Sequence, residues 1–392
     1  MIKRFWALAL MTLLFCARAR AAQLGPATSY DELLALADGA KEGDILLISG
    51  TIRADADQPF SPAAALELRG EGDASISGLH LQDASIVLSN MTLTDGLSAR
   101  GESRIQLMRG VSVKDGLSFS GSGALLLDPG SNVSAGSGAT GVSVHHAGGD
   151  LYISLDGAIR GGDGATGGAA VVIDPLGASG ALMVTGSLTG GTGEAFGGNA
   201  LNLHNLSGNA YITVDGRLTG GAGEIGGCGL QLITADGGVT AGIGGQITGG
   251  RGNRYGGDGM LMMNVGGSAS VTLSGSLTGG DASGTDSTPG QSLTLLGQTT
   301  AMRTNVTGEC ILQNGRQVLY ALSVTPLPAI TSSADDAEEI DPTPSPEATA
   351  EPTQEPTVEP TQTPTAEPTP QPTVEPTAEP TEIPAATSGE AA

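Results

Sequence analysis

Two aspartates in the middle of the chain are the acidic residues whose spacing could support acid–base chemistry. A short phrase ending in Gly-Gly occurs five times there, its copies beginning at Gly157, Gly186, Gly216, Gly245 and Gly275. The position before that glycine holds, in turn, Asp156, Thr185, Asp215, Gly244 and Ser274. If each copy is one rung of a stack, Asp156 and Asp215 lie about 9–10 Å apart, in the loose range of an inverting glycosidase pair. Adjacent rungs carry no carboxylate, so we interpret both aspartates as solvated turn residues.

The histidines include one adjacent pair, His145-His146, with His80 and His204 elsewhere in the chain. A metal site needs several ligands at suitable spacing, and no cysteine or carboxylate array accompanies this pair. Strand alternation would also point the two rings to opposite faces. The sequence therefore predicts no metal ion and no cofactor.

Four of the few aromatic residues recur at matching places in the repeat. Phe196 and Tyr255 each stand directly before the second glycine pair of a copy, and Tyr152 and Tyr211 occupy equivalent positions two copies apart. A regular row of rings could stack on sugars, so these four residues are the candidate glycan contacts. We favour the other interpretation, in which the rings pack the loops onto the body of the protein.

The nearly fixed period of the glycine phrase, roughly 30 residues, predicts stacked units, each covering an apolar face that its neighbour cannot bury alone. An earlier strand-then-glycine phrase, at Gly78, Gly96, Gly116 and Gly136, has a shorter period of roughly 20 residues. The roughly ten extra residues of each later copy match a glycine-rich segment, first seen at 161–168. We therefore expect every later coil to add one glycine loop, and the loops to align into a ridge.

The glycine loops resemble calcium-binding nonapeptide repeats, whose pattern is Gly-Gly-x-Gly-x-Asp-x-apolar-x. Those repeats run in tandem and supply an aspartate from each turn, whereas the aligned position here holds Thr166, Phe196, Ile225 or Arg254. Calcium needs several oxygen ligands. We therefore favour glycines that serve tight turns and close backbone approach.

The start of the mature chain contains a helix followed by a buried strand. Ser29-Tyr30-Asp31-Glu32 is a capping box ahead of an amphipathic segment that ends near Gly39, and the apolar run 45–48 predicts the strand. A helix followed by Gly43-Asp44-Ile45-Leu46-Leu47 resembles the N-terminal cap of pectin-lyase-like proteins. The resemblance implies an all-β fold, a right-handed parallel β-helix solenoid with a short capping helix. Polysaccharide lyases on that fold hold calcium with clustered carboxylates and use an arginine or lysine base, a set absent from the repeat positions.

Residues 1–21 have the composition of a secretory signal peptide, with a basic start, an apolar run from Phe5 to Cys16 and an Ala-x-Ala site. We place cleavage after Ala21, and the apolar run is too short to span a bilayer. After export and cleavage, Cys228 and Cys310 remain, and an oxidising compartment favours a disulfide between them. At three rungs apart, about 14 Å, they lie beyond disulfide reach, so we predict two unpaired thiols.

The chain is acidic, with a formal net charge of -24 that becomes about -28 once the four basic residues of the leader are removed. Residues 331–392 hold 14 acidic residues and no lysine or arginine, with a proline at every fourth position from Pro352 to Pro380. Such a segment stays extended and disordered, and it resembles the Pro/Thr-rich spacers of bacterial surface proteins. The charge argues against nucleic acid and anionic lipid as partners.

We therefore predict a signal peptide over 1–21, a parallel β-helix over 22–330 and a disordered acidic tail over 331–392. Coils of about 18–20 residues would run to about 145, five coils of about 29–30 residues would run from about 150 to 298, and a C-terminal cap would end at 330. We expect a secreted or cell-wall-associated monomer without catalysis, an adhesin-like protein that contacts polysaccharide or a host or neighbouring cell along one face. Two alternatives stay open: a polysaccharide lyase or glycoside hydrolase on the same fold, and a purely structural surface spacer.

Overall fold

The computed structural model describes most of the chain between the predicted leader and the predicted tail. The described residues are 21–146, 148–235, 237–265 and 269–296, with the backbone of three short later strands at 306–307, 311–313 and 318–319. Residues 1–20 of the predicted signal peptide, Cys310, most of the predicted C-terminal cap and the acidic tail lie outside the described residues.

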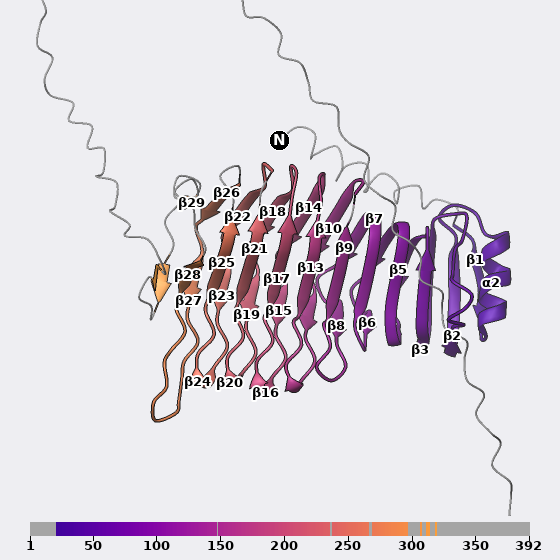
Figure 1. The fold of residues 1–392 in the computed structure, drawn as a ribbon. Helices are drawn as coiled ribbons and strands as arrows, with labels where there is room; N and C mark the ends of the chain where they lie inside the picture. The colour runs from indigo at the N-terminus through magenta and orange to yellow at the C-terminus, as the bar shows by residue number, and fades with distance from the viewer. Residues whose placement is uncertain are drawn as a thin grey trace, which may run out of the picture. The chain divides into compact units, whose positions relative to one another are not determined.

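The described chain winds into coils whose strands pair in parallel with the equivalent strands of the coils before and after (Figure 1). The N-terminal end consists of β1 (Gln23–Ala27), helix α2 (Tyr30–Gly39) and β2 (Ile45–Arg53). The early coils use long strands that continue around corners, together with shorter ones: β3 (Leu66–Gln82), β4 (Ser85–Ser89), β5 (Thr92–Leu107), β6 (Ser112–Val113), β7 (Leu117–Leu127), β8 (Asn132–Ser134) and β9 (Val142–His146).

Each later coil has three body strands, which stack into three series. The first series is β10 (Leu151–Leu155), β14 (Gly180–Val184), β18 (Tyr211–Val214), β22 (Thr240–Ile243) and β26 (Ser270–Leu273). The second is β11 (Ala158–Arg160), β15 (Ser187–Thr189), β19 (Arg217–Thr219), β23 (Gln246–Thr248) and β27 (Ser276–Thr278). The third is β13 (Val171–Leu176), β17 (Leu201–Leu206), β21 (Leu230–Ala235), β25 (Met260–Val265) and β28 (Leu293–Leu296). The strands β29 (Val306–Thr307), β30 (Ile311–Gln313) and β31 (Val318–Leu319) extend these ladders.

Strand register measures the length of each coil directly. One ladder joins Leu79, Leu97, Leu117, Val142, Val171, Leu201, Leu230, Met260 and Leu293. The early steps of this ladder are short and the later ones long, in agreement with the two predicted periods. The step from Leu117 to Val142 is of intermediate length, and the structure thus adds a transitional coil between the two kinds. The expected fold class, an all-β parallel β-helix solenoid with a short capping helix, is confirmed.

The core is a stack of aliphatic side chains, one per coil in each ladder. In the second series and its early equivalents, the inward residue is at most 2% exposed in every coil: Ile52, Ile76, Leu93, Val113, Val133, Ile159, Leu188, Leu218, Ile247 and Leu277. Burying one such side chain stabilises a fold by about 1.5–3 kcal/mol. The apolar centre of each repeated phrase therefore holds one coil on the next.

Four glycine loops form a second, four-stranded parallel sheet of β12 (Gly164–Thr166), β16 (Gly193–Phe196), β20 (Gly223–Ile225) and β24 (Gly252–Tyr255). We call this sheet, with its flanking glycine pairs (residues 161–168, 190–198, 220–227 and 249–257), the glycine fin. It lies along one edge of the coils (Figure 1). The predicted ridge of aligned loops is therefore present.

Close backbone approach explains the glycines at the base of the fin. Gly191 N–H donates to the Gly168 carbonyl, and Gly198 N–H donates to the Gly191 carbonyl, each at 2.8 Å. A Cβ on Gly221 would lie well inside van der Waals contact of the Gly191 carbonyl oxygen. The two walls of the fin thus meet with no side chain between them, as the preference for close approach predicted.

Helix α2 covers the N-terminal end of the coils, and side chains tie it down. Ser29 Oγ accepts the Glu32 N–H at 3.3 Å, as the capping box predicts. The Glu32 carboxylate reaches one residue further back than expected and accepts from the Thr28 N–H at 2.7 Å. Asp44 accepts from the N–H groups of Ala22 and Lys41 at 3.0 and 2.9 Å, so one carboxylate joins the chain start to the turn before β2.

Candidate functional site

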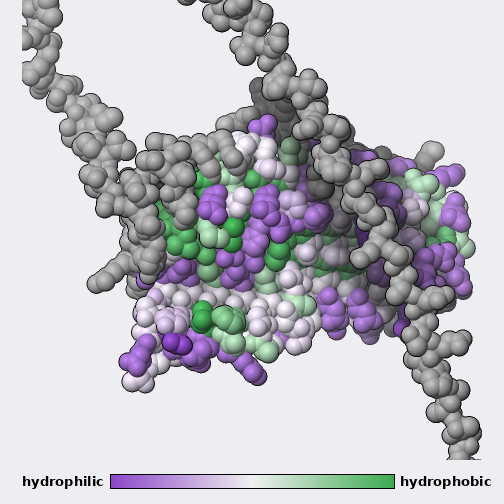
Figure 2. All heavy atoms as spheres, viewed as in Figure 1, coloured by the Kyte–Doolittle hydropathy of each residue, from purple (hydrophilic) through white to green (hydrophobic). Residues whose placement is uncertain are grey.

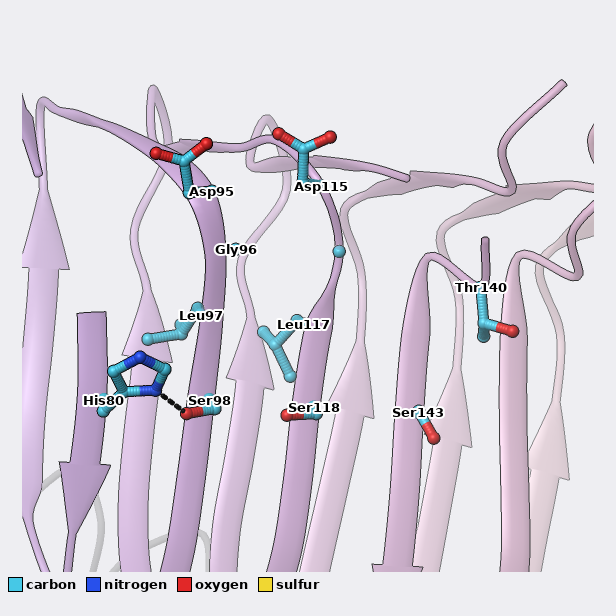
Figure 3. Close-up of a pocket in the computed structure, with 11 residues that line it drawn as sticks. His80, Asp95, Gly96, Leu97, Ser98, Asp115, Leu117, Ser118, Thr140 and Ser143 are labelled. Atoms are coloured by element: carbon cyan, nitrogen blue, oxygen red, sulfur yellow. Dashed lines mark hydrogen bonds between the residues drawn. The ribbon is translucent and has the colours of Figure 1, made fainter. Parts of the chain in front are cut away.

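A groove crosses the outer surface of the early coils, where β3, β5, β7 and β9 lie side by side (Figure 3). Its volume is about 240 Å³. The polar groups that line it include Asp95 and Asp115 at the turns, and His80, Ser98 and Ser118 on the strands.

The two aspartates of the groove lie at equivalent turns of adjacent coils. Each precedes a glycine, and each has a left-handed backbone, with φ of 59° at Asp95 and 64° at Asp115, which aspartate tolerates. The leucines two residues later, Leu97 and Leu117, are register partners. The two Cα atoms are therefore about 4.8 Å apart, and Figure 3 shows the carboxylates side by side.

A row of polar side chains runs along the floor of the groove, below the aspartates. His80 Nδ1 lies 2.6 Å from Ser98 Oγ, and Ser118 and Ser143 continue the row in register on the next coils. Carboxylates, an imidazole and hydroxyls in one groove can all hydrogen-bond the hydroxyl groups of a sugar.

Two neighbouring carboxylates in a groove are also the residue types that a glycoside-hydrolysing site uses. Retaining and inverting glycosidases both use a pair of carboxylates, and these two lie on neighbouring coils. Both side chains are exposed to solvent, however, and Ser77 Oγ donates to Asp95. Neither has the apolar enclosure that keeps a catalytic carboxylic acid protonated.

Sequence reasoning missed this pair, although a signal for it exists. The phrase Asp-Gly-Leu occurs at Asp95 and again at Asp115, one early coil later. The glycine of this phrase predicts a turn, whereas the aspartate before it has no predicted role. Aligning the early coils as strictly as the late ones would have placed the two carboxylates next to each other.

The aspartates that the repeat singled out behave as turn residues. Asp156 follows β10, accepts from Ser154 Oγ at 3.3 Å and accepts from the Thr185 hydroxyl on the next coil. Asp215 is exposed two coils away, with Thr185 at the equivalent position between them. The structure therefore does not bring Asp156 and Asp215 together into a site.

The adjacent histidines point to opposite sides of their strand, as predicted. His145 is exposed and its Nδ1 lies 2.8 Å from the Asp174 carbonyl. His146 is fully buried, with its Nδ1 accepting from Gly177 N–H at 3.2 Å and its Nε2 lying 3.0 Å from the Gly149 carbonyl. These partners assign the neutral ring with the proton on Nε2, so His146 has no free nitrogen for a metal.

The four candidate aromatic residues form two separate rows. Tyr152 on β10 and Tyr211 on β18 are half-buried, two coils apart, with Ala181 of β14 paired between them. Phe196 and Tyr255 belong to the other sheet, in the fin, also two coils apart with Ile225 between them. No single face carries all four rings.

The fin row is the one that leaves its rings in solvent. Phe196 is 52% exposed and Tyr255 is 40% exposed, and they are the large apolar side chains that stay exposed in the described part of the chain. The Arg254 guanidinium lies 5.1 Å from the Tyr255 ring centroid, and this cation–π contact stabilises the position of the ring. Figure 2 shows apolar surface over the fin at the lower edge of this view. Both rings therefore keep a large share of their surface in solvent, and complete packing of the rings onto the body is not observed.

Cys228 stands at the base of the fin and is unpaired, as predicted. Burial, together with the nearby Asp258 carboxylate, raises the pKa of its thiol to about 11. Among the described residues, no three His, Cys, Asp or Glu side chains come together in a way that could hold a metal ion. In the same residues, no helix is long and apolar enough to cross a membrane.

Comparison with known proteins gives one structural similarity. No family model matches the chain, and no curated protein matches it. Among solved structures, the chain is similar to the catalytic domain of a GH87 α-1,3-glucanase variant in complex with tetrasaccharides. The two share 10% sequence identity with a TM-score of 0.32, over 74% of this chain and 68% of the other. Similarity at this level is too low to transfer a site or an activity.

Proposed function

We propose that this protein is an extracellular, non-catalytic polysaccharide-binding protein, acting as a monomer at a cell surface or in a matrix. The observation that carries the proposal is the pair of exposed rings, Phe196 and Tyr255, held in register on the glycine fin. Exposed aromatic side chains on a rigid sheet offer flat apolar faces for sugar rings at little entropic cost. Because Ile225 lies on the coil between them, the rings are about 10 Å apart along the solenoid axis.

The test is a binding measurement on the mature protein. A panel of soluble polysaccharides is screened by affinity electrophoresis, and the tightest one is titrated by calorimetry against the wild type, Phe196→Ala and Tyr255→Ala. We expect each substitution to weaken binding about two- to tenfold, the range for loss of one stacking contact.

A matched control removes an apolar, partly exposed side chain from another sheet. Met183→Ala on β14 is outside the fin and should bind as the wild type does. Wild-type binding in all three variants would move the site away from the fin. No binding to any polysaccharide in the panel would leave the structural-spacer alternative.

Glycoside hydrolysis is the second candidate function, and the observation that favours it is the carboxylate pair of the groove. Asp95 and Asp115 lie on adjacent coils and line the same groove, and a pair of carboxylates is what most glycosidases use. A reducing-end assay on the polysaccharide that binds best distinguishes the two functions. Turnover that disappears in Asp95→Asn and in Asp115→Asn would contradict the non-catalytic proposal, which predicts no release of reducing ends by the wild type.

A further inference from the structure

A regular row of threonines runs along the outer face of the second strand series, on the same coils that carry the fin. Thr189, Thr219, Thr248 and Thr278 are direct register partners on β15, β19, β23 and β27. Each is half-exposed and lies just before the glycine pair that begins the fin or its continuation. We call the outward side chains of these four strands the threonine face.

The hydroxyl groups of this row are free to meet a ligand. None of the four makes a side-chain hydrogen bond to a described residue. Because threonine is branched at Cβ, its rotamer is restricted on a strand, and the hydroxyls are ordered before any ligand arrives. Each can donate one hydrogen bond and accept others. The row therefore repeats a donor and an acceptor about every 4.8 Å along the axis.

The composition of the same face continues over the early coils. From Thr51 and Arg53 to Ser276 and Thr278, ten coils each present two outward positions, and these hold 13 serines or threonines and no aspartate or glutamate. The whole chain has 41 acidic and 17 basic residues, so this face departs from its surroundings.

We infer that the threonine face is a second contact surface for a linear, uncharged polysaccharide that lies along the solenoid axis. The coil rise of about 4.8 Å is close to the length of one pyranose unit in an extended chain, so one sugar meets one coil. We commit to an uncharged occupant because, of the eight outward residues on the four strands of the threonine face, seven are neutral and Arg217 alone is charged. This inference rests on the polysaccharide binding proposed above and adds a surface that is separate from the fin rings.

The test replaces two hydroxyls while keeping the side-chain shape. Thr219→Val/Thr248→Val removes two central hydroxyls of the row. The matched control, Thr213→Val/Thr240→Val, makes the same change on β18 and β22 of the first series. Both variants should unfold at the wild-type temperature within a few degrees, because valine suits a strand as well as threonine does. We expect the first variant to bind a linear neutral polysaccharide about tenfold or more weakly, and the control to bind as the wild type does.

The outcomes separate this inference from the proposed function. If the threonine variant binds normally while Phe196→Ala binds weakly, the fin binds polysaccharide and the threonine face does not. If an anionic polysaccharide binds more tightly than its neutral counterpart, and added salt abolishes that binding, the uncharged occupant is wrong. If the wild type binds no polysaccharide, both proposals fail.

Discussion

At the scale of single residues, the glycine fin depends on the absence of side chains at its base. Gly221 approaches the Gly191 carbonyl so closely that an added methyl group would overlap backbone atoms. Gly242 lies on β22, in the first strand series, and no atom lies within 4 Å of the position that a Cβ would take there. The two glycines therefore allow the same substitution to be compared at a crowded and at an open site.

We predict that Gly221→Ala lowers the free energy of unfolding by about 2–3 kcal/mol, because backbone atoms must shift to admit the methyl group. Gly242→Ala should change the free energy of unfolding by about 1 kcal/mol or less, because the backbone conformation there suits alanine and the space around the added methyl group is empty. Urea unfolding followed by circular dichroism measures both. Equal effects of the two substitutions would show that close approach does not explain the glycines of the fin.

The thiol of Cys228 is a second residue-scale test, because burial raises its pKa to about 11. At pH 8 the folded protein therefore holds this group as the unreactive thiol, whereas an unfolded cysteine, with a pKa near 8.5, is partly thiolate. In a Cys310→Ser background, we predict that a disulfide reagent labels Cys228 at least tenfold more slowly in native protein than in urea. Rapid native labelling would place Cys228 at the surface.

At the scale of elements, Asp44 fastens the N-terminal cap to the first coil. The N–H groups of Lys41 and Ala22 hold the pKa of Asp44 below its ordinary value. A carboxylate with a lowered pKa stabilises the fold above its unfolded value, near pH 4, and this contribution is lost as the pH falls. Asp44→Asn should therefore cost about 1.5–3 kcal/mol of unfolding free energy at pH 7.

The same variant should lose part of that deficit at pH 3, below the pKa of an unfolded aspartate, because the stability that the wild-type carboxylate contributes is lost as the pH falls. Urea unfolding at both pH values provides the comparison. A deficit of equal size at pH 7 and pH 3 would mean that the charge of Asp44 plays no part in holding the cap.

Most elements of the body were predictable because every copy of the repeated phrase has the same structural role. The apolar centre, such as Leu188 or Leu218, must be buried in every coil, so its period equals the coil length. The glycine pairs were predictable as close contacts for the same reason. The transitional coil between Leu117 and Val142 was not predicted, because its loop lacks the Gly-Gly phrase that marks the later ones.

The candidate site was harder to predict than the fold. Equivalence of Asp95 and Asp115 depends on the register of the early coils, whose weakly repeated phrases leave the alignment open. The exposure of Phe196 and Tyr255 determines whether a ligand can reach them, and the sequence period alone does not report whether a ring on a loop packs inward or stays in solvent. The positions of the rings were therefore predictable, whereas their environment was not.

At the scale of the whole molecule, parallel stacking makes each later coil an independent unit of length. Coils contact their neighbours only, so removing one complete unit should leave the others able to pair. Deleting residues 216–244 joins Asp215 to Gly245 and preserves the repeated phrase. We predict a folded protein with an unchanged type of circular dichroism spectrum and a single unfolding transition. A variant that fails to fold would show that the coils are not interchangeable.

The central claim is that the coils lie on top of one another in register. This register aligns Phe196 with Tyr255 on the fin and aligns the residues of the threonine face. Thr51 and Ser276 are linked by nine register steps, or about 43 Å, and Ala158 and Ser276 by four, or about 19 Å. Spin labels are attached at each pair in a chain without its native cysteines, and pulsed electron paramagnetic resonance measures both distances. The account predicts that the first distance is more than twice the second, in the ratio of nine steps to four. Two similar distances, both far short of the nine-step value, would contradict it.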